Sequence, residues 1–177
     1  AAIEHGVNYF DCADIYGVGA SEIVVGQLLK ELLPRDEYAL TTKVSMPMGR
    51  APNQGGLSRK HIMEGVDQSL KRLGHDYVDQ LIIHRHPHGI PGLAQTPIEE
   101  TMEALNDVVK AGKALYLGAS SMFAWQFAEL QMTAAHNGWT KFISMQNHLN
   151  LIYREEEREM IPYCVKTGVA VTPWSPL

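Results

Sequence analysis

The stretch IMEGVDQSLKRLGHDYVDQLIIH, residues 62–84, contains a predicted helix, a glycine and a predicted strand in that order. Its first apolar residues recur at steps of three or four, which places them on one face of a helix. These residues are Ile62, Val66, Leu70 and Leu73. Gly74 follows the helical run, as a left-handed C-cap residue should, and the apolar segment 77–84 then predicts a buried strand.

The same order of helix, glycine and strand recurs along the chain. Another helical stripe comprises Ile98, Met102, Leu105 and Val109, and further glycines between helix and strand are Gly6, Gly112, Gly138 and Gly168. The predicted strands are Val7–Asp11, Tyr38–Val44, Tyr77–His84, Ala114–Ala119, Lys141–Asn147 and Val169–Trp174. Strands that alternate with helices are joined by right-handed crossovers, so the pattern predicts an α/β fold with a parallel sheet.

The sequence also predicts where two of the helices begin. Ser58 is positioned to cap the helix that contains Ile62. Thr96, Pro97 and Glu99 have the spacing of an N-cap, a proline at the first helical position and a capping-box glutamate. We therefore expect one helix to begin after Ser58 and another after Thr96.

Composition and charge indicate a single soluble domain. The chain has 177 residues, 45% of them hydrophobic, and no uncharged segment is long enough to cross a bilayer. The net charge of −5 and scattered basic residues argue against a nucleic-acid partner. Two cysteines, Cys12 and Cys164, offer no disulfide framework or metal cluster, which fits the reducing cytoplasm.

Four polar residues lie at or just past the ends of three successive predicted strands. They are Asp11, Tyr16, Lys43 and His84. The carboxyl ends of parallel strands meet at one rim, so these side chains should converge there. Lys43 is unusual because its strand reads as buried, and a buried ammonium needs a partner. An acid, a phenol, an ammonium and an imidazole at one rim predict a proton-transfer site.

Residues 17–22 offer a first alternative, a dinucleotide-binding loop. Gly17 and Gly19 lie between a strand and a helix, but Glu22 stands where a third glycine is expected. The acidic residue expected on the next strand is also missing. A Rossmann fold is therefore the weaker interpretation.

The alternation of His84, His86 and His88 offers a second alternative, a zinc site. Pro87 and Gly89 break the strand there, and no carboxylate lies nearby in the loop. An irregular, solvated loop accounts better for His86 and His88, so we expect no metal.

The chain resembles the aldo-keto reductases through a series of motifs at successive strand ends. In order, they are Asp11-Cys12-Ala13-Asp14-Ile15-Tyr16-Gly17, Thr42-Lys43, Leu81-Ile82-Ile83-His84, Gly118-Ala119-Ser120, Gln146 and Pro173-Trp174-Ser175-Pro176-Leu177. The resemblance implies a parallel (β/α)8 barrel of the TIM type, of which six strands are present and the first and eighth are missing. Residues 1–177 are thus expected to form a single incomplete barrel domain.

The resemblance also implies an activity, the NADP-dependent reduction of aldehydes or ketones to alcohols by hydride transfer. Tyr16 would give the proton to the substrate oxygen. Lys43 would favour the phenolate of Tyr16, and Asp11 would hold Lys43 as a buried carboxylate partner. His84 would orient and polarise the substrate oxygen by a hydrogen bond.

The later strand ends would hold the cofactor, which the resemblance implies to be NADP(H), with NAD not excluded. Ser120 and Gln146 match the residues that grip the nicotinamide carboxamide, and Trp174 matches the aromatic residue that stacks on the ring. The segment that follows, Ser175, Pro176 and Leu177, matches the start of the loop along the diphosphate. Ser121 stands where the family often has asparagine, which leaves a second amide contact open.

Two other functions remain open at this point. Potassium-channel beta subunits share the implied fold and a closely similar Trp-Ser-Pro-Leu segment, but they typically carry asparagine where this chain has His84. An inactive reductase fragment would also keep these motifs. The partner of an active enzyme would be a small-molecule carbonyl substrate. The loops 45–57 and 85–96, which would set specificity, identify no particular substrate, and the oligomeric state is likewise open.

Overall fold

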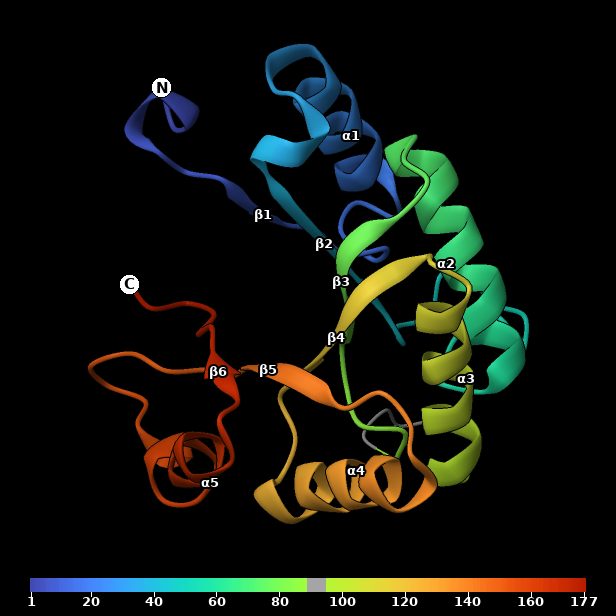
Figure 1. Cartoon of the computed structure of the whole chain (residues 1–177), viewed down its shortest axis with the longest axis vertical. Helices are drawn as coiled ribbons and strands as arrows, with labels where there is room; N and C mark the ends of the chain where they lie inside the picture. The colour runs from blue at the N-terminus through green and yellow to red at the C-terminus, as the bar shows by residue number, and fades with distance from the viewer. Residues whose placement is uncertain (89–94) are drawn as a thin grey trace.

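The computed structural model, which describes residues 1–88 and 95–177, has a six-stranded parallel sheet with strand order β1-β2-β3-β4-β5-β6. The sheet curls into an open arc, with both termini on its open side (Figure 1). Part of loop 85–96, expected to shape substrate specificity, lies outside the described residues. The architecture is a partial (β/α)8 barrel, which confirms the predicted fold class.

All six predicted strands are present, and each lies within or very near its predicted segment. They are β1 Tyr9–Asp11, β2 Ala39–Val44, β3 Val78–Ile83, β4 Ala114–Ser120, β5 Phe142–Gln146 and β6 Ala170–Val171. The last strand is only two residues long. Beyond β6, an isolated parallel bridge joins His148 to Trp174.

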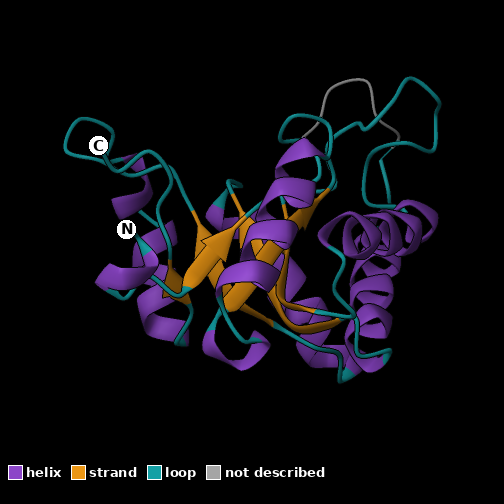
Figure 2. Cartoon of the chain, turned by 90° about the horizontal axis from the view of Figure 1, so that it is seen from above, coloured by secondary structure: helices purple, strands orange, loops and turns teal. Residues whose placement is uncertain are grey.

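Helices alternate with the strands. They are α1 Ala20–Leu32, α2 Arg59–Leu73, α3 Ile98–Lys110, α4 Ala124–Asn137 and α5 Met160–Thr167, with short 3-10 turns at Ile3–His5, Arg35–Glu37 and Glu155–Glu157. The helices lie outside the curled sheet, as two views at right angles show (Figures 1 and 2). None of the helices in the described part of the chain has the length and apolarity that a membrane span requires.

The helix ends confirm most of the predicted caps. The Ser58 side chain accepts a hydrogen bond from the His61 backbone N–H at 3.3 Å. All five glycines predicted between helix and strand have positive φ, between 67° and 84°. The prediction for α3 is wrong by one residue: Pro97 is the N-cap, and no side chain caps the helix. Its extended backbone, with ψ of 139°, delays the first helical residue to Ile98, so Thr96 and Glu99 form no capping box.

The hydrophobic core lies between the convex face of the sheet and the helices. Strand residues on this face alternate with those on the concave face, as the pleat requires. The largest fully buried apolar side chains of this layer include Leu40, Ile62, Leu81, Ile83, Met102, Leu105 and Phe127. The apolar helix stripes recognised in the sequence therefore face the sheet. Several polar strand residues, among them Lys43, Gln80 and Ser144, lie on the concave face, whereas Thr42 faces helix α1.

The concave face carries hydrogen bonds that cross several strands. Tyr9 Oη donates to Gln80 Oε1 at 2.9 Å, and Gln80 Nε2 donates to Ser144 Oγ at 2.8 Å. Gly118 lies on the strand between them, where a Cβ atom would come within 2.8 Å of Ser144 Oγ. Glycine at this position therefore lets Gln80 and Ser144 meet across β4.

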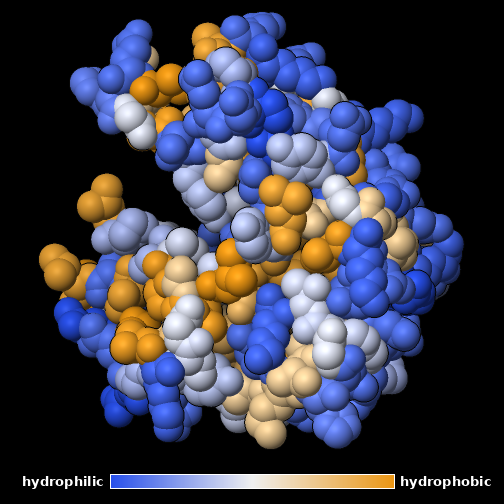
Figure 3. Space-filling model, viewed as in Figure 1, coloured by the Kyte–Doolittle hydropathy of each residue, from blue (hydrophilic) through white to orange (hydrophobic). Residues whose placement is uncertain are grey.

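A hollow opens between the two terminal parts of the chain on the concave side (Figure 3). Apolar strand residues remain exposed in the described chain, among them Tyr9, Tyr116 and Ile143. The strands β1 and β6 are the edges of the sheet. The carboxyl ends of all six strands meet at one rim of this hollow, which is where the predicted site residues should be found.

Candidate active site

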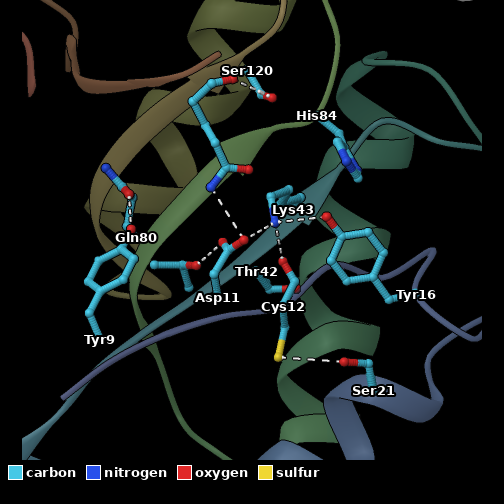
Figure 4. A network of polar contacts seen from close by, with 12 residues as sticks. Tyr9, Asp11, Cys12, Tyr16, Ser21, Thr42, Lys43, Gln80, His84 and Ser120 are labelled. Atoms are coloured by element: carbon cyan, nitrogen blue, oxygen red, sulfur yellow. Dashed lines mark hydrogen bonds and ion pairs between the residues drawn. The ribbon is translucent and has the colours of Figure 1, made fainter. Parts of the chain in front are cut away.

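The ammonium group of Lys43 is the centre of the rim. Lys43 Nζ lies 2.5 Å from Asp11 Oδ2, 2.7 Å from the Cys12 carbonyl oxygen and 3.4 Å from Tyr16 Oη (Figure 4). Asp11 ends β1, Lys43 is the penultimate residue of β2, and Tyr16 lies in the loop before α1. The Lys43 side chain is fully buried, so its charge depends on these oxygen atoms.

The carboxylate of Asp11 accepts hydrogen bonds from three sides. Besides Lys43, Thr41 Oγ1 donates to Oδ1 at 2.6 Å and Gln146 Nε2 donates to Oδ2 at 3.3 Å. The side chain is 30% exposed, so the expectation of a buried carboxylate is only partly met. Three donors from two strand ends nevertheless fix the carboxylate, and through it the position of the ammonium group.

The imidazole of His84 completes the group expected from the sequence. His84 directly follows β3, and its backbone N–H donates to the Val44 carbonyl at 2.9 Å. The ring packs edge-on against Tyr16, with ring centroids 5.7 Å apart. Burial, and then the positive charges of Lys43 and Arg85, lower the pKa of His84 to about 4. The imidazole is therefore neutral near pH 7 and can donate one N–H.

The three residues expected to hold a nicotinamide lie at the ends of β4, β5 and β6. Ser120 Oγ donates to the Gln146 backbone carbonyl at 2.9 Å, and both side chains are more than nine-tenths buried. Because Gln146 Nε2 is used by Asp11, its amide oxygen is the atom left for a ligand. Trp174 is 37% exposed, and its indole N–H donates to Ser121 Oγ at 2.9 Å.

The segment after Trp174 is exposed at its end. The Ser175 carbonyl accepts a hydrogen bond from Asn150 Nδ2 at 3.1 Å, whereas Pro176 and Leu177 are exposed. A cavity of about 770 Å³ lies beside Trp174 and is also lined by Ser121, His148 and Tyr153. The structure thus brings Ser120, Gln146 and Trp174 to one part of the rim and leaves Pro176 and Leu177 exposed.

The loop between β1 and α1 does not have the form of a dinucleotide fingerprint. Glu22, which replaces the third glycine, is fully buried. It accepts hydrogen bonds from Thr42 Oγ1 at 2.5 Å and from Arg72 Nε at 2.6 Å. A buried, paired carboxylate in the first turn of α1 would repel a phosphate, so the Rossmann interpretation is excluded.

The alternating histidines divide between two environments. His86 is buried, with its ring 5.3 Å from that of His88, whereas His84 packs against Tyr16. Burial, with a smaller contribution from His88, lowers the pKa of His86 to about 4. Within residues 1–88 and 95–177, no three His, Cys, Asp or Glu side chains gather as metal ligands would.

Asp14, in the same loop as Tyr16, is a buried carboxyl that the sequence did not single out. Its Oδ1 accepts from the Ile15 N–H at 2.6 Å, and Oδ2 has no hydrogen-bond partner in the described structure. Burial raises the pKa of Asp14 to about 7, and the nearby carboxylate of Glu22 adds to the shift. This group therefore carries a proton over much of the range in which an ordinary aspartate is charged.

Sequence reasoning missed several other residues around the rim. Thr41 shares a strand face with Lys43, two residues away, and that spacing could have identified it. His148 contacts Trp174 and Tyr153, but His148 and Tyr153 lie in a loop without a periodic pattern, and no local signal in the sequence marks them. Ser121, which the resemblance marked only as a departure from the family, accepts a hydrogen bond from the Trp174 indole.

Comparison with known proteins identifies the family of the chain. The aldo/keto reductase family model matches residues 1–177. The chain is 48% identical to a Schizosaccharomyces pombe protein provisionally named an aryl-alcohol dehydrogenase, over 100% of the chain and 59% of that protein. It is 49% identical to versiconal hemiacetal acetate reductase of Aspergillus parasiticus, over 99% of the chain and 55% of the relative. Aldo-keto reductase AMT2 of Alternaria alternata is 45% identical, over 100% and 53%.

The chain thus spans little more than half the length of the curated relatives it matches. The family model covers every residue, and the Lys43 centre lies at the strand ends where the motifs predicted it. The chain belongs to the aldo/keto reductase family.

Proposed function

We propose that the protein containing this chain reduces aldehydes or ketones to alcohols with NADPH, and that Tyr16 donates the proton. The observation that carries the proposal is the buried Lys43 ammonium, held 2.5 Å from Asp11 and 3.4 Å from Tyr16 Oη. A cation at this distance stabilises the negative charge that develops on the phenol oxygen as its proton leaves. Membership of the aldo/keto reductase family supports a nicotinamide-dependent oxidoreductase.

In this proposal, the chain's residues handle the proton and the substrate oxygen. As negative charge develops on the carbonyl oxygen, the Tyr16 O–H bond breaks and its proton moves to that oxygen. Lys43 stabilises the phenolate that remains, and Asp11 holds Lys43 in place. His84 is neutral near pH 7, so it can offer an N–H to the same oxygen without adding a second positive charge next to Lys43.

The side chains at the later strand ends fit the nicotinamide of the cofactor. The bound cofactor would supply a hydride to the carbonyl carbon. Gln146 offers an amide oxygen and Ser120 a hydroxyl oxygen, both able to accept from a carboxamide N–H, and Trp174 offers an aromatic face. From the family resemblance we propose NADP(H) as the cofactor, with NAD(H) as the alternative, and we propose that Ser175, Pro176 and Leu177 begin the diphosphate loop.

Small-molecule carbonyl compounds are the proposed substrates, with aromatic aldehydes as the first class to examine. The Schizosaccharomyces pombe relative carries aryl-alcohol dehydrogenase in its name, and it is 48% identical to the chain. The cavity beside Trp174 is lined with aromatic side chains, among them Phe123 and Tyr153. Charged residues, among them Glu156 and Arg158, also line it, so the aromatic part of the lining would take the ring of an aromatic aldehyde.

The test is NADPH oxidation with a panel of aromatic and aliphatic aldehydes and ketones, catalysed by the protein containing this chain. Tyr16→Phe should lower turnover by about 10²–10⁴-fold while cofactor affinity stays within about twofold, because the change removes only the proton donor. Tyr116→Phe, at an exposed tyrosine on β4, is the matched control and should leave turnover unchanged.

Retention of turnover in Tyr16→Phe would remove Tyr16 from the chemistry. An equal loss of turnover and cofactor affinity would show that Tyr16 holds the structure of the site and is not the proton donor.

A further inference from the structure

Three aromatic rings are stacked on one another at the rim beside β6. The rings of Trp174 and His148 lie 4.1 Å apart with an angle of 9° between their planes. The rings of His148 and Tyr153 lie 4.3 Å apart at 17°. These contacts are face to face, so the imidazole is held between an indole and a phenol and covers one face of the indole.

Hydrogen bonds to the backbone hold both ends of this stack, Trp174 and Tyr153. The Trp174 N–H donates to the Asn147 carbonyl at 2.8 Å, next to the bridge between His148 and Trp174. Asn150 then fixes the other half of the stack. Its Oδ1 accepts from the Tyr153 N–H at 2.8 Å, and this turn brings Tyr153 back over His148. The loop after β5 and the segment after β6 therefore meet as one unit.

The amide group of Asn150 also orients the imidazole. Its Nδ2 lies 3.2 Å from His148 Nε2 and 3.1 Å from the Ser175 carbonyl oxygen. An amide N–H can only donate, so His148 Nε2 is the acceptor of this hydrogen bond. The hydrogen bond thus fixes the rotation of the His148 ring within its own plane, and the Trp174 and Tyr153 rings fix its position between them.

We propose that His148 is a positioning residue for the nicotinamide site, and that it acts by fixing the Trp174 indole so that only the face away from His148 is offered to the cofactor ring. This inference rests on the proposed function, in which Trp174 stacks on the nicotinamide. The Ser121 hydroxyl fixes the rotation of the indole within its own plane, because it accepts a hydrogen bond from the indole N–H at 2.9 Å. Tyr153 supports His148 from its other face.

The position of the stack argues for a role in binding and against simple core packing. Trp174 and Tyr153 are each 37% exposed, and both line the cavity at the rim. A mobile indole loses rotamer freedom when a ligand binds against it, so a site whose indole is already ordered binds the ligand more tightly. The contacts in the stack order the Trp174 indole before the cofactor binds.

The experiment compares His148→Ala with His148→Phe in the protein containing this chain. An aromatic pair contributes about 0.5–1.5 kcal/mol, so His148→Ala should raise the NADPH Kd about threefold to tenfold. His148→Phe keeps a flat ring and should stay within about twofold of the parent protein. His136→Ala, at an exposed histidine of α4, is the matched control and should leave the Kd unchanged.

Trp174 emission gives a second measurement that needs no cofactor. The Trp174 contribution is isolated as the difference between each protein and its Trp174→Phe counterpart. His148→Ala should shift this emission to longer wavelength, because water reaches the uncovered indole face, and His148→Phe should restore it. A purely structural role for His148 would instead lower the unfolding temperature of both variants and give no rescue of the Kd.

Trp174→Leu separates the two proposals. If Trp174→Leu leaves the NADPH Kd unchanged, the proposed cofactor site and the role of His148 are both overturned. If Trp174→Leu weakens binding while His148→Ala does not, the cofactor site stands and the positioning role of His148 is overturned. Weaker binding in Trp174→Leu and His148→Ala, with rescue in His148→Phe, supports both.

Discussion

The two halves of the rim are built on different physical principles. At the ends of β1, β2 and β3, the structure gathers charged and titratable groups around the buried ammonium of Lys43. At the ends of β4, β5 and β6, the corresponding residues Ser120, Gln146 and Trp174 are neutral and are held by hydrogen bonds and stacking.

This difference shows how each half obtains its order. A buried charge must be paired, so Lys43 and Asp11 are fixed directly by strands that the core holds in place. Neutral groups need no counter-ion, and Trp174 is fixed by two residues of the loops that begin just after β4 and β5, Ser121 and His148. The charged half should therefore lose much stability when one partner is removed, while the neutral half should lose affinity first.

Lys43→Met should produce the largest loss of stability. It leaves Asp11 with Thr41 and Gln146 as donors but without a counter-ion. We expect the free energy of unfolding to fall by about 3 kcal/mol, the lower end of the range for a broken buried pair, because Asp11 is 30% exposed. Urea denaturation measures this loss.

Lys60→Met is the matched control for Lys43→Met. Lys60 pairs with Glu64 on the exposed surface of α2, so its removal should change stability by less than about 0.5 kcal/mol. Equal losses in the two variants would contradict the contrast between the halves of the rim, because the ion pair at the rim would then behave like a surface pair.

Asp14→Asn tests whether the charged half of the rim contains a carboxyl group whose ionisation destabilises the fold. The pKa of Asp14 is raised from its ordinary 3.8 to about 7, so between these values the unfolded carboxyl ionises while the folded one keeps its proton. Folding stability is therefore lost as pH rises through this window and stays low above it. Asparagine keeps an oxygen for the Ile15 N–H and removes the charge.

A rise in pKa from 3.8 to about 7 corresponds to roughly 4 kcal/mol, and we expect about half of it to be recovered, because an ionised Asp14 can draw water into the loop. Asp14→Asn should thus stabilise the protein by about 2 kcal/mol at pH 8 and leave stability nearly unchanged at pH 4. His84 has the opposite pH dependence, because its lowered pKa reduces stability as pH falls below 6.5, and this contribution cancels when variant and parent are compared at the same pH. Asp36→Asn, at an exposed aspartate, should give no pH-dependent gain. A gain of equal size at pH 4 and pH 8 would exclude the ionisation of Asp14 as its cause.

The same contrast explains what the sequence could predict. The strands, the helix stripes and the glycine turns depend on local periodicity and on backbone conformation. The sequence therefore predicts Ile62 and Leu73 as buried helix residues and Gly74 as the C-cap. The convergence of Asp11, Lys43 and His84 follows from the direction of parallel strands. The start of α3 was placed one residue early, because Thr96 and Pro97 fit two adjacent cap positions equally well.

The remaining features depend on contacts between distant residues. Glu22 is paired with Arg72, 50 residues away, and no spacing in the sequence indicates that pair. The stack of Tyr153, His148 and Trp174 depends on a loop turned by Asn150, and loops have no periodicity from which side-chain directions can be read. The sequence therefore predicts which strand ends carry chemistry more readily than it predicts how the loops order them.

Gln146→Leu examines the one described hydrogen bond between site residues of the two halves, and it should have the smallest effect on stability. Gln146 Nε2 reaches Asp11 Oδ2 at 3.3 Å, whereas Thr41 Oγ1 reaches the other oxygen at 2.6 Å. A longer hydrogen bond is weaker, so Gln146→Leu should lower the free energy of unfolding by about 1 kcal/mol, and Thr41→Val by more. Urea denaturation of both variants at one pH gives the ranking. The reverse ranking would mean that the neutral half of the rim holds the Asp11 carboxylate more firmly than its own strand neighbour does, and the two halves would then have to be treated as one coupled network.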